Sequence, residues 1–202
     1  MSGERAERTR QTRRRIKEAL VELIAEKGFD SLTVSDVTRC AHINRGTFYL
    51  HFTDKYDMMA KLEDELIARL EQVLLQEGDE PHDPRDLFPY ERLLPALELV
   101  AQDIDFVRAV AGRGGDPEFS SKLRSVIEGL FAQGLERSDC TLRDDDELPL
   151  VYARELALSH VLTIINLWLE RGGTESPEQL ARIIVGAKDV SPASLLIGDR
   201  LT

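Results

Sequence analysis

The sequence predicts an all-α protein with two parts: an N-terminal three-helix helix-turn-helix domain at residues 1–55 and a C-terminal helical bundle at residues 56–202. Hydrophobic residues recur at helical spacing along most of the chain, and stretches rich in Gly, Asp and Pro separate these segments. No strand pattern competes with the helical one. The 202 residues are 42% hydrophobic and 31% charged, which suits a soluble globular protein with a substantial core.

The chain carries no sequence signal for export or for a membrane. Its Arg-rich N-terminus has no apolar segment after it, unlike a secretory signal peptide. No apolar run approaches the roughly 18 residues of a membrane-spanning helix. The two cysteines, Cys40 and Cys140, fit no metal spacing, and a reducing compartment keeps both as thiols. We therefore expect a cytoplasmic protein whose cysteines are small buried residues, with a redox role as the alternative.

The first helix is expected from about Thr9 to Gly28, because glycine supplies a stop. Its buried face is marked by hydrophobic residues at helical spacing: Ile16, Leu20, Leu23 and Ile24. Thr33 is a favourable N-cap for a second helix at 34–40, and Asp36 adds negative charge near its start.

A third, short helix is expected at 45–51, after a turn of only about three residues, Ala41-His42-Ile43. Asn44 is a strong N-cap residue for it. Two short helices joined by a tight turn form the helix-turn-helix arrangement. Several hydrophobic residues of this arrangement are expected to pack inward against the first helix: Val37, Ile43, Phe48 and Phe52.

The outer faces of the helix at 45–51 carry donors and aromatic rings that suit DNA. Arg45 has the fork that pairs with guanine, and Gly46 lets the backbone approach closely. Thr47 has a methyl group for thymine and a hydroxyl for phosphate. Three further donors can reach phosphate oxygens: Tyr49, His51 and Lys55. The alternative is a polar helical surface with aromatic residues by chance.

The distribution of charge agrees with a nucleic-acid partner, although the net charge of −11 alone argues against one. Residues 1–60 carry 11 Lys and Arg against 9 Asp and Glu, so the whole excess of acidic residues lies in residues 61–202. The first 17 residues hold seven basic side chains and two acidic ones. This segment is either a positive arm or a solvated tail.

Two stretches closely resemble the N-terminal signature of the tetracycline-repressor (TetR) family, Leu32-Thr33-Val34-Ser35-Asp36-Val37 and the run from Ile43 to Lys55. The resemblance covers about residues 9–60 and implies a homodimeric regulator that binds palindromic operator DNA. It places eight residues nearest the DNA: Thr33, Ser35, Arg45, Gly46, Thr47, Tyr49, His51 and Lys55. One departure is His42, where many members have Gly. It puts the geometry of the turn in question, because a left-handed backbone is harder for His than for Gly.

Five further helices are expected in the C-terminal part. The first runs from about Met58 past Leu74 and ends near Gly78. The stretch from Gly78 to Pro89 reads as a loop, and its His82 has no partner at metal-ligand spacing. Four helices follow at about 90–112, 117–137, 148–171 and 177–188.

The helix at 148–171 is apolar almost all the way round, so it must be covered on more than one side. A second copy of the chain is the simplest cover, with a narrow polar stripe where helices approach closely: Ser159, Thr163 and Asn166. A buried core helix within one subunit is the alternative. The TetR resemblance implies pairing through the last two long helices.

A small-molecule effector of unknown identity is expected from the resemblance, because TetR relatives commonly enclose one among their central helices. Five polar or aromatic residues in otherwise apolar helices are candidates for its site, although each is more often a satisfied core group: Arg108, Tyr152, His160, Asn166 and Trp168. The sequence has no phosphate-binding glycine loop, metal cluster or nucleophile motif, so we expect no enzyme, cofactor or metal.

The C-terminal half resembles a subgroup of the family found largely in Gram-positive bacteria. The likeness rests on the endings Trp168-Leu169-Glu170-Arg171-Gly172 and Ser176-Pro177-Glu178. Some relatives in that subgroup are co-activators that dock onto a metabolic kinase subunit. A ligand-responsive repressor is therefore the leading interpretation, and a co-activator that acts through a protein partner is the alternative.

Overall fold

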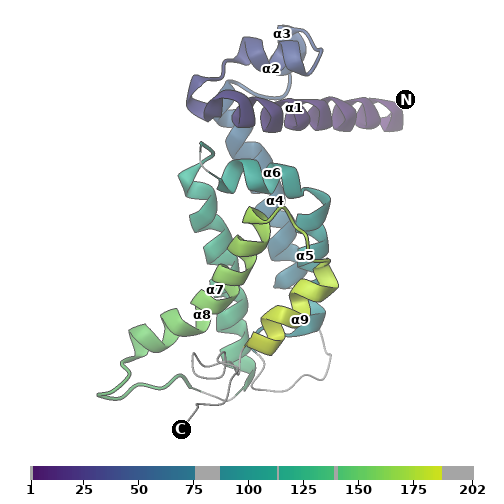
Figure 1. Cartoon of the computed structure of the whole chain (residues 1–202). Coiled ribbons are helices and arrows are strands. Elements are labelled where there is room, and N and C mark those ends of the chain that lie inside the picture. The colour runs from purple at the N-terminus through teal and green to yellow at the C-terminus, as the bar shows by residue number, and fades with distance from the viewer. Residues whose placement is uncertain (1, 76–86, 113, 139–140, 188–202) are drawn as a thin grey trace. The chain divides into compact units, whose positions relative to one another are not determined.

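The computed structural model describes residues 2–75, 87–112, 114–138 and 141–187. Within these ranges all regular structure is helical, as predicted (Figure 1). The chain forms two compact units, residues 1–72 with 102–126 and residues 73–101 with 127–202. The helices are α1 Ser2–Ser31, α2 Val34–Cys40, α3 Arg45–Tyr49, α4 Lys55–Leu74, α5 Tyr90–Gln102, α6 Ile104–Ala111, α7 Pro117–Ser138, α8 Leu150–Glu170 and α9 Pro177–Ala187.

The core of the first unit forms where α1 packs against α2 and α6. The hydrophobic residues predicted for the buried face of α1 are all buried, and so are those of the helix-turn-helix apart from the half-buried Ile43. As predicted, the regular helix stops at Gly28, whose φ of 75° and ψ of 160° are not helical, and a short further helical piece completes α1 after this kink. The amide of Phe29 then donates to the carbonyl of Gly114 at 3.0 Å, which ties the end of α1 to the segment before α7.

The expected single helix at 90–112 is wrong, because the chain breaks at Asp103 into α5 and α6. Asp103 has φ −118° and ψ 24°, outside the helical region. Its carboxylate accepts from Lys17 of α1 at 2.6 Å and pairs with Arg69 of α4 at 3.5 Å. These two cations come from distant parts of the sequence, so the local pattern gave no sign of the break.

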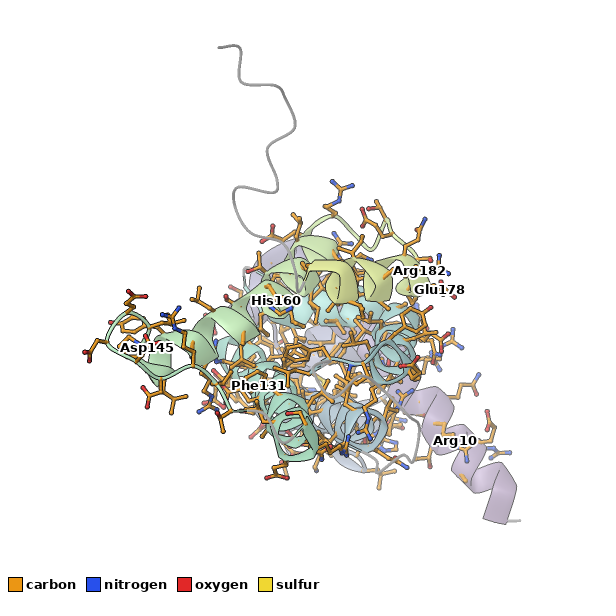
Figure 2. The ribbon with its side chains drawn as sticks, turned by 90° about the horizontal axis from the view of Figure 1, so that it is seen from below. Arg10, Phe131, Asp145, His160, Glu178 and Arg182 are labelled. Carbon is orange, nitrogen blue, oxygen red and sulfur yellow. The ribbon has the colours of Figure 1, made fainter. Side chains whose placement is uncertain are left out.

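The second unit has its core between α5, α7, α8 and α9. Phe88 stacks on Phe131 with the ring centroids 5.9 Å apart, and its edge meets the ring of His160 at 5.7 Å. Figure 2 shows Phe131 and His160 on the inner side of these helices, and Asp145 on the loop before α8. The inward face of α8 is buried along its length: Ala153, Leu158, Val161, Ile165, Trp168 and Leu169.

The opposite face of α8 is open. Its exposed members follow one helical stripe and include the predicted polar residues: Tyr152, Leu156, Ser159, Thr163, Asn166 and Leu167. The helix is therefore not covered all round by its own subunit. By length and composition alone, α8 would also be long and apolar enough to cross a membrane. Arg154 and Glu155 within it argue against that, since each charge is costly in a bilayer.

The remaining sequence expectations concern the cysteines, the loop after α4 and the domain boundary. Cys40 is half-buried, its thiol donates to Glu22 at 3.2 Å, and burial beside this carboxylate raises its pKa. The thiol form is therefore favoured. Gly78, His82 and Cys140 lie outside the described residues. The domain boundary at residue 55 stays a prediction.

Candidate nucleic-acid interface

The start of α2 is fixed by a capping box. The Thr33 hydroxyl accepts from the amide of Asp36 at 3.2 Å, and the Asp36 carboxylate accepts from the amide of Thr33 at 2.9 Å. Lys27 of α1 pairs with the same carboxylate at 2.8 Å. Lys27 and Thr33 hold the pKa of Asp36 well below its usual range. The exposed Thr33 thus stands at a rigid helix start.

The turn between α2 and α3 has a left-handed residue at its centre. His42 has a φ of 51°, so the strained geometry that Gly would adopt easily is kept with His. The amide of Ile43 donates to Thr38 at 3.0 Å, and Arg15 of α1 donates to the carbonyl of His42 at 2.9 Å. These bonds stabilise the tight turn, so the departure at His42 leaves the helix-turn-helix intact.

Asn44 caps α3 and organises its first turn. Its Oδ1 accepts from the amide of Thr47 at 2.7 Å and from the Thr47 hydroxyl at 3.0 Å. The Thr47 proton is therefore used within the helix, while its methyl group and oxygen lone pairs are not. A Cβ on Gly46 would lie 3.2 Å from the same Oδ1, so a larger residue would crowd this cap.

Arg45 and Ser35 meet across the helix-turn-helix, since the guanidinium of Arg45 donates to the Ser35 hydroxyl. Both side chains are exposed. This contact holds a long cationic side chain close to the start of α2. A donor fork held in one position loses less entropy on binding a base or a phosphate.

Phe48 and Tyr49 divide α3 into two faces. Phe48 is fully buried and packs against Phe52, with the ring centroids 5.6 Å apart. Tyr49 is 55% exposed, and its ring meets Phe48 edge-on at 5.5 Å. The buried ring therefore orients the exposed one.

Leu50 and Tyr56 are two further exposed side chains of this region that the sequence-based site did not include. They are 83% and 62% exposed. For Leu50 the available signal was an apolar residue directly after α3, because a folded chain seldom exposes a Leu this fully without a partner or a turn that demands it.

The predicted phosphate donors His51 and Lys55 are both half-buried. Burial, together with the charge of Arg13, lowers the pKa of His51 and favours its neutral form. The Lys55 ammonium donates to three carbonyls at and just after the end of α1, those of Phe29, Asp30 and Leu32, at 3.1, 2.8 and 3.1 Å. An ammonium has three protons, so Lys55 has none left for phosphate in this arrangement.

The eight residues predicted nearest DNA all belong to the first unit. Five of them are exposed on α2 and α3 or at their starts: Thr33, Ser35, Arg45, Gly46 and Tyr49. Thr47 is half-buried, and its hydroxyl faces the cap of its own helix. The surface therefore combines one guanidinium, one phenol and small groups over a backbone that is fixed by caps.

The five candidate effector residues are not gathered at one place. Arg108 is exposed in the first unit, and the others lie on α8. Tyr152 and Asn166 are exposed, whereas Trp168 is buried and donates from its indole nitrogen to the carbonyl of Glu175 at 2.9 Å. His160 is half-buried, and burial lowers its pKa. Among the described residues, no group of three or more His, Cys, Asp or Glu is placed to hold a metal.

Two family profiles match this chain. Residues 16–62 match "Bacterial regulatory proteins, tetR family", and residues 89–187 match a "Transcriptional regulator C-terminal region" of the same family. The chain belongs to the TetR family. TetR-family proteins are DNA-binding regulators that dimerise, and some bind small-molecule effectors. The first match covers the capped helices and the outer surface described above.

Curated relatives match parts of this TetR-family chain. The HTH-type transcriptional regulator YvdT of Bacillus subtilis is 35% identical over 60 residues, 29% of this chain and 31% of that protein. The HTH-type transcriptional repressor BepR of Brucella suis is 31% identical over 94 residues, 46% of this chain and 44% of that protein. The chain spans between about a third and a half of the length of the curated relatives it matches.

Solved TetR-family structures share the fold. PfmR from Thermus thermophilus has a TM-score of 0.61 at 19% identity, with 85% of this chain and 95% of that one covered. FadR from Bacillus subtilis, solved with stearoyl-CoA, has a TM-score of 0.56 at 19% identity, with 86% and 95% covered. Membership of the Gram-positive subgroup stays a prediction.

Proposed function

We propose that this TetR-family regulator is a ligand-responsive repressor that binds a palindromic operator as a homodimer. The observation that carries the proposal is α3: Phe48 anchors it in the core, and Arg45 and Tyr49 are exposed on its outer side. An exposed helix of this kind fits the major groove, where its N-terminal residues meet base edges. The repressor relative BepR supports the direction of regulation.

Each exposed side chain has a role within this proposal. Arg45 leaves or shares its contact with Ser35 and donates its fork to a guanine. Thr47 offers its methyl group to a thymine, and Tyr49 donates to a phosphate. Lys55 holds the connector before α2, so it positions Thr33 and Ser35 and reaches no phosphate itself.

The second unit is proposed to supply the dimer contact. The exposed stripe of α8 combines apolar Tyr152, Leu156 and Leu167 with small or polar residues, and α9 packs beside α8 with Ile183 46% exposed. A self-complementary apolar face of this kind suits a two-fold interface.

An effector site among the helices of the second unit is proposed as well, with His160 beside Phe88 as its most promising polar group. The stearoyl-CoA bound by FadR supports a ligand in a protein of this fold. A co-activator that needs a protein partner is not favoured by the relatives. As for the family in general, the cytoplasm is the proposed location.

Selection of binding sites from random DNA duplexes tests the repressor proposal. A dimer should return a palindrome with half-sites about 34–36 Å apart or somewhat wider. Arg45→Ala should cost about 1–3 kcal/mol and relax the preference at one position of each half-site, whereas Tyr49→Phe should weaken all sites evenly. Binding that appears only after a second protein is added, with no palindrome, would replace repression by the co-activator alternative.

A further inference from the structure

The outermost described side chains of α1 do not pack into the first unit, whereas Arg13 and Arg15 nearer its middle do contact it. The helix begins at Ser2, yet Ile16 is the first buried residue among its described side chains, and residues 6–11 are all exposed. Fourteen residues of helix extend about 21 Å. Figure 1 shows these turns running out beyond α2, α3 and α6. A polar helix of this length is marginal in water, so this segment is expected to gain from a partner.

Two contacts fix which way this segment faces. Arg15 donates to the carbonyl of His42, in the turn between α2 and α3. Lys17 instead pairs with Asp103, just before α6. Residues 15 and 17 point about 200° apart on a helix, so the Arg15 side faces the DNA-reading turn and the Lys17 side faces α6.

Arg8 lies on the same side as Arg15. The two are seven residues apart, which is about two turns, and Gln11 and Thr12 fall between them at helical spacing. We name Arg8, Gln11 and Thr12 the Arg8 face. Arg8 and Gln11 carry hydrogen-bond donors, and Arg8 also carries a permanent positive charge, whereas the Thr12 hydroxyl already donates to the carbonyl of Arg8 at 2.9 Å.

Arg10 and Arg14 lie on a different side. Arg10 is two residues from Arg8, so it points about 200° away, and Arg14 is one turn further on the Arg10 side. Each has an acidic partner on its own helix, Glu7 at 3.5 Å for Arg10 and Glu18 at 2.8 Å for Arg14. Figure 2 shows Arg10 on the outlying turns of α1. Because these two arginines lie on the other side of the same helix, they provide a matched comparison for Arg8.

We propose that the Arg8 face is a second DNA-binding surface, which grips backbone phosphates beside the half-site that α3 reads. The inference rests on the proposed function for the half-site and adds a contact outside it. We choose DNA as the partner because of charge complementarity: a basic helix on the same side as the turn between α2 and α3 would meet a regular row of phosphates. The length of the segment corresponds to about six base pairs at roughly 3.4 Å each.

Salt dependence of binding tests this surface. Affinity is measured for wild type, Arg8→Ala and Arg10→Ala between 50 and 200 mM salt, on the selected palindrome with flanking base pairs and on a random duplex of equal length. Arg8→Ala should remove one phosphate contact per subunit, so the affinity advantage of wild type should shrink roughly tenfold over this range for a dimer. Arg10→Ala should match wild type.

The random duplex separates the two proposals, because phosphate contacts carry no sequence information. If wild type shows no preference for a palindrome, the repressor proposal fails, and a lower salt slope for Arg8→Ala on either duplex still supports the Arg8 face. Equal slopes for all three proteins, or equal losses for both variants, overturn the Arg8 face. Loss of binding to phosphatidylserine vesicles by Arg8→Ala, with DNA binding unchanged, overturns it in favour of a membrane partner. Thermal melts should be the same for all three proteins, because neither arginine is buried.

Discussion

Adjacent residues on α3 have opposite tasks because a helix turns about 100° per residue. Phe48 is fully buried, and Tyr49 is 55% exposed. The first belongs to the core that holds the helix, and the second belongs to the surface that we propose meets DNA. A pair of neighbouring substitutions therefore separates folding from binding.

Phe48→Ala should lower the free energy of unfolding by about 3–5 kcal/mol, because it leaves a cavity where a whole ring was packed. Tyr49→Ala should change stability little, since its ring contacts Phe48 only edge-on, and should weaken DNA binding. Chemical unfolding and duplex binding measure the two effects. The reverse pattern would mean that the two faces of α3 are misassigned.

Glu63 of α4 is a buried acid whose charge is only partly satisfied. It is fully buried, Lys122 of α7 donates to Oε2 at 3.2 Å, and Oε1 has no hydrogen-bond partner. Lys122 also donates to the more exposed Asp64 at 2.7 Å, and Asp116 adds a further negative charge nearby. Burial outweighs the attraction of Lys122 and raises the pKa of Glu63 to about 7.

The raised pKa makes stability depend on pH. Between pH 4.5 and about 7 the unfolded chain loses the Glu63 proton and the folded chain keeps it, so the stabilisation is complete below pH 4.5 and is lost as pH rises to 7. Glu63→Gln should remove this pH dependence, which totals about 3 kcal/mol of unfolding free energy between pH 4.5 and 7. At pH 8 the variant should therefore be more stable than wild type. Thermal melts from pH 4.5 to 8 measure the pH dependence of stability for wild type and Glu63→Gln, and Glu71→Gln, at an exposed position of α4, is the control. A slope that persists in Glu63→Gln would assign it to other groups.

At the scale of elements, the helix-turn-helix is joined by side chains that bond to backbone. Asn44 caps α3, Arg15 holds the turn at His42, and Lys55 holds the connector between α1 and α2. Each bond satisfies a polar backbone group that helix ends leave open. Short helices of five and seven residues depend on such bonds, because they have few internal ones.

Lys55→Ala should therefore lower stability by about 1–3 kcal/mol, because three carbonyls lose a charged donor. Its DNA binding should weaken with an unchanged salt slope, since the loss acts through the position of α2. Unfolding and salt-dependent binding are measured on the same variant. Unchanged stability with a lower salt slope would instead make Lys55 a direct phosphate contact.

At the scale of the whole molecule, the open face of α8 has to be explained. Leu156 and Leu167 are 61% and 54% exposed on one stripe. Exposed apolar faces of this length usually mark an interface. The homodimer is typical of the family, and this stripe is where we expect it.

Leu156→Glu should convert the dimer into monomer, because pairing would bury an unpaired charge. The fold of the subunit should survive, since the side chain is exposed within it. Val151→Glu is the control: Val151 is 63% exposed on α8 but points about 140° away from Leu156. Analytical ultracentrifugation measures the oligomeric state of both variants. A Leu156→Glu dimer as stable as wild type would move the interface off this stripe.

Local sequence determined most of the helices and which side chains of the helix-turn-helix are buried or exposed. Caps such as Thr33 and Asn44 act within three residues, so α2 was predicted with its observed bounds and the start of α3 was right. Hydrophobic spacing likewise predicted the buried rings Phe48 and Phe52. The family signature supplied the remaining positions of the surface.

Tertiary structure decided what depends on residues far apart in the chain. Asp103, where the helix breaks, pairs with Lys17 and Arg69, and Lys55 donates to carbonyls more than twenty residues earlier. The direction of the Arg8 face depends on the bond from Arg15 to His42, 27 residues away. Helical periodicity reports only on contacts within a few turns, so long-range ion pairs and hydrogen bonds leave no trace in it.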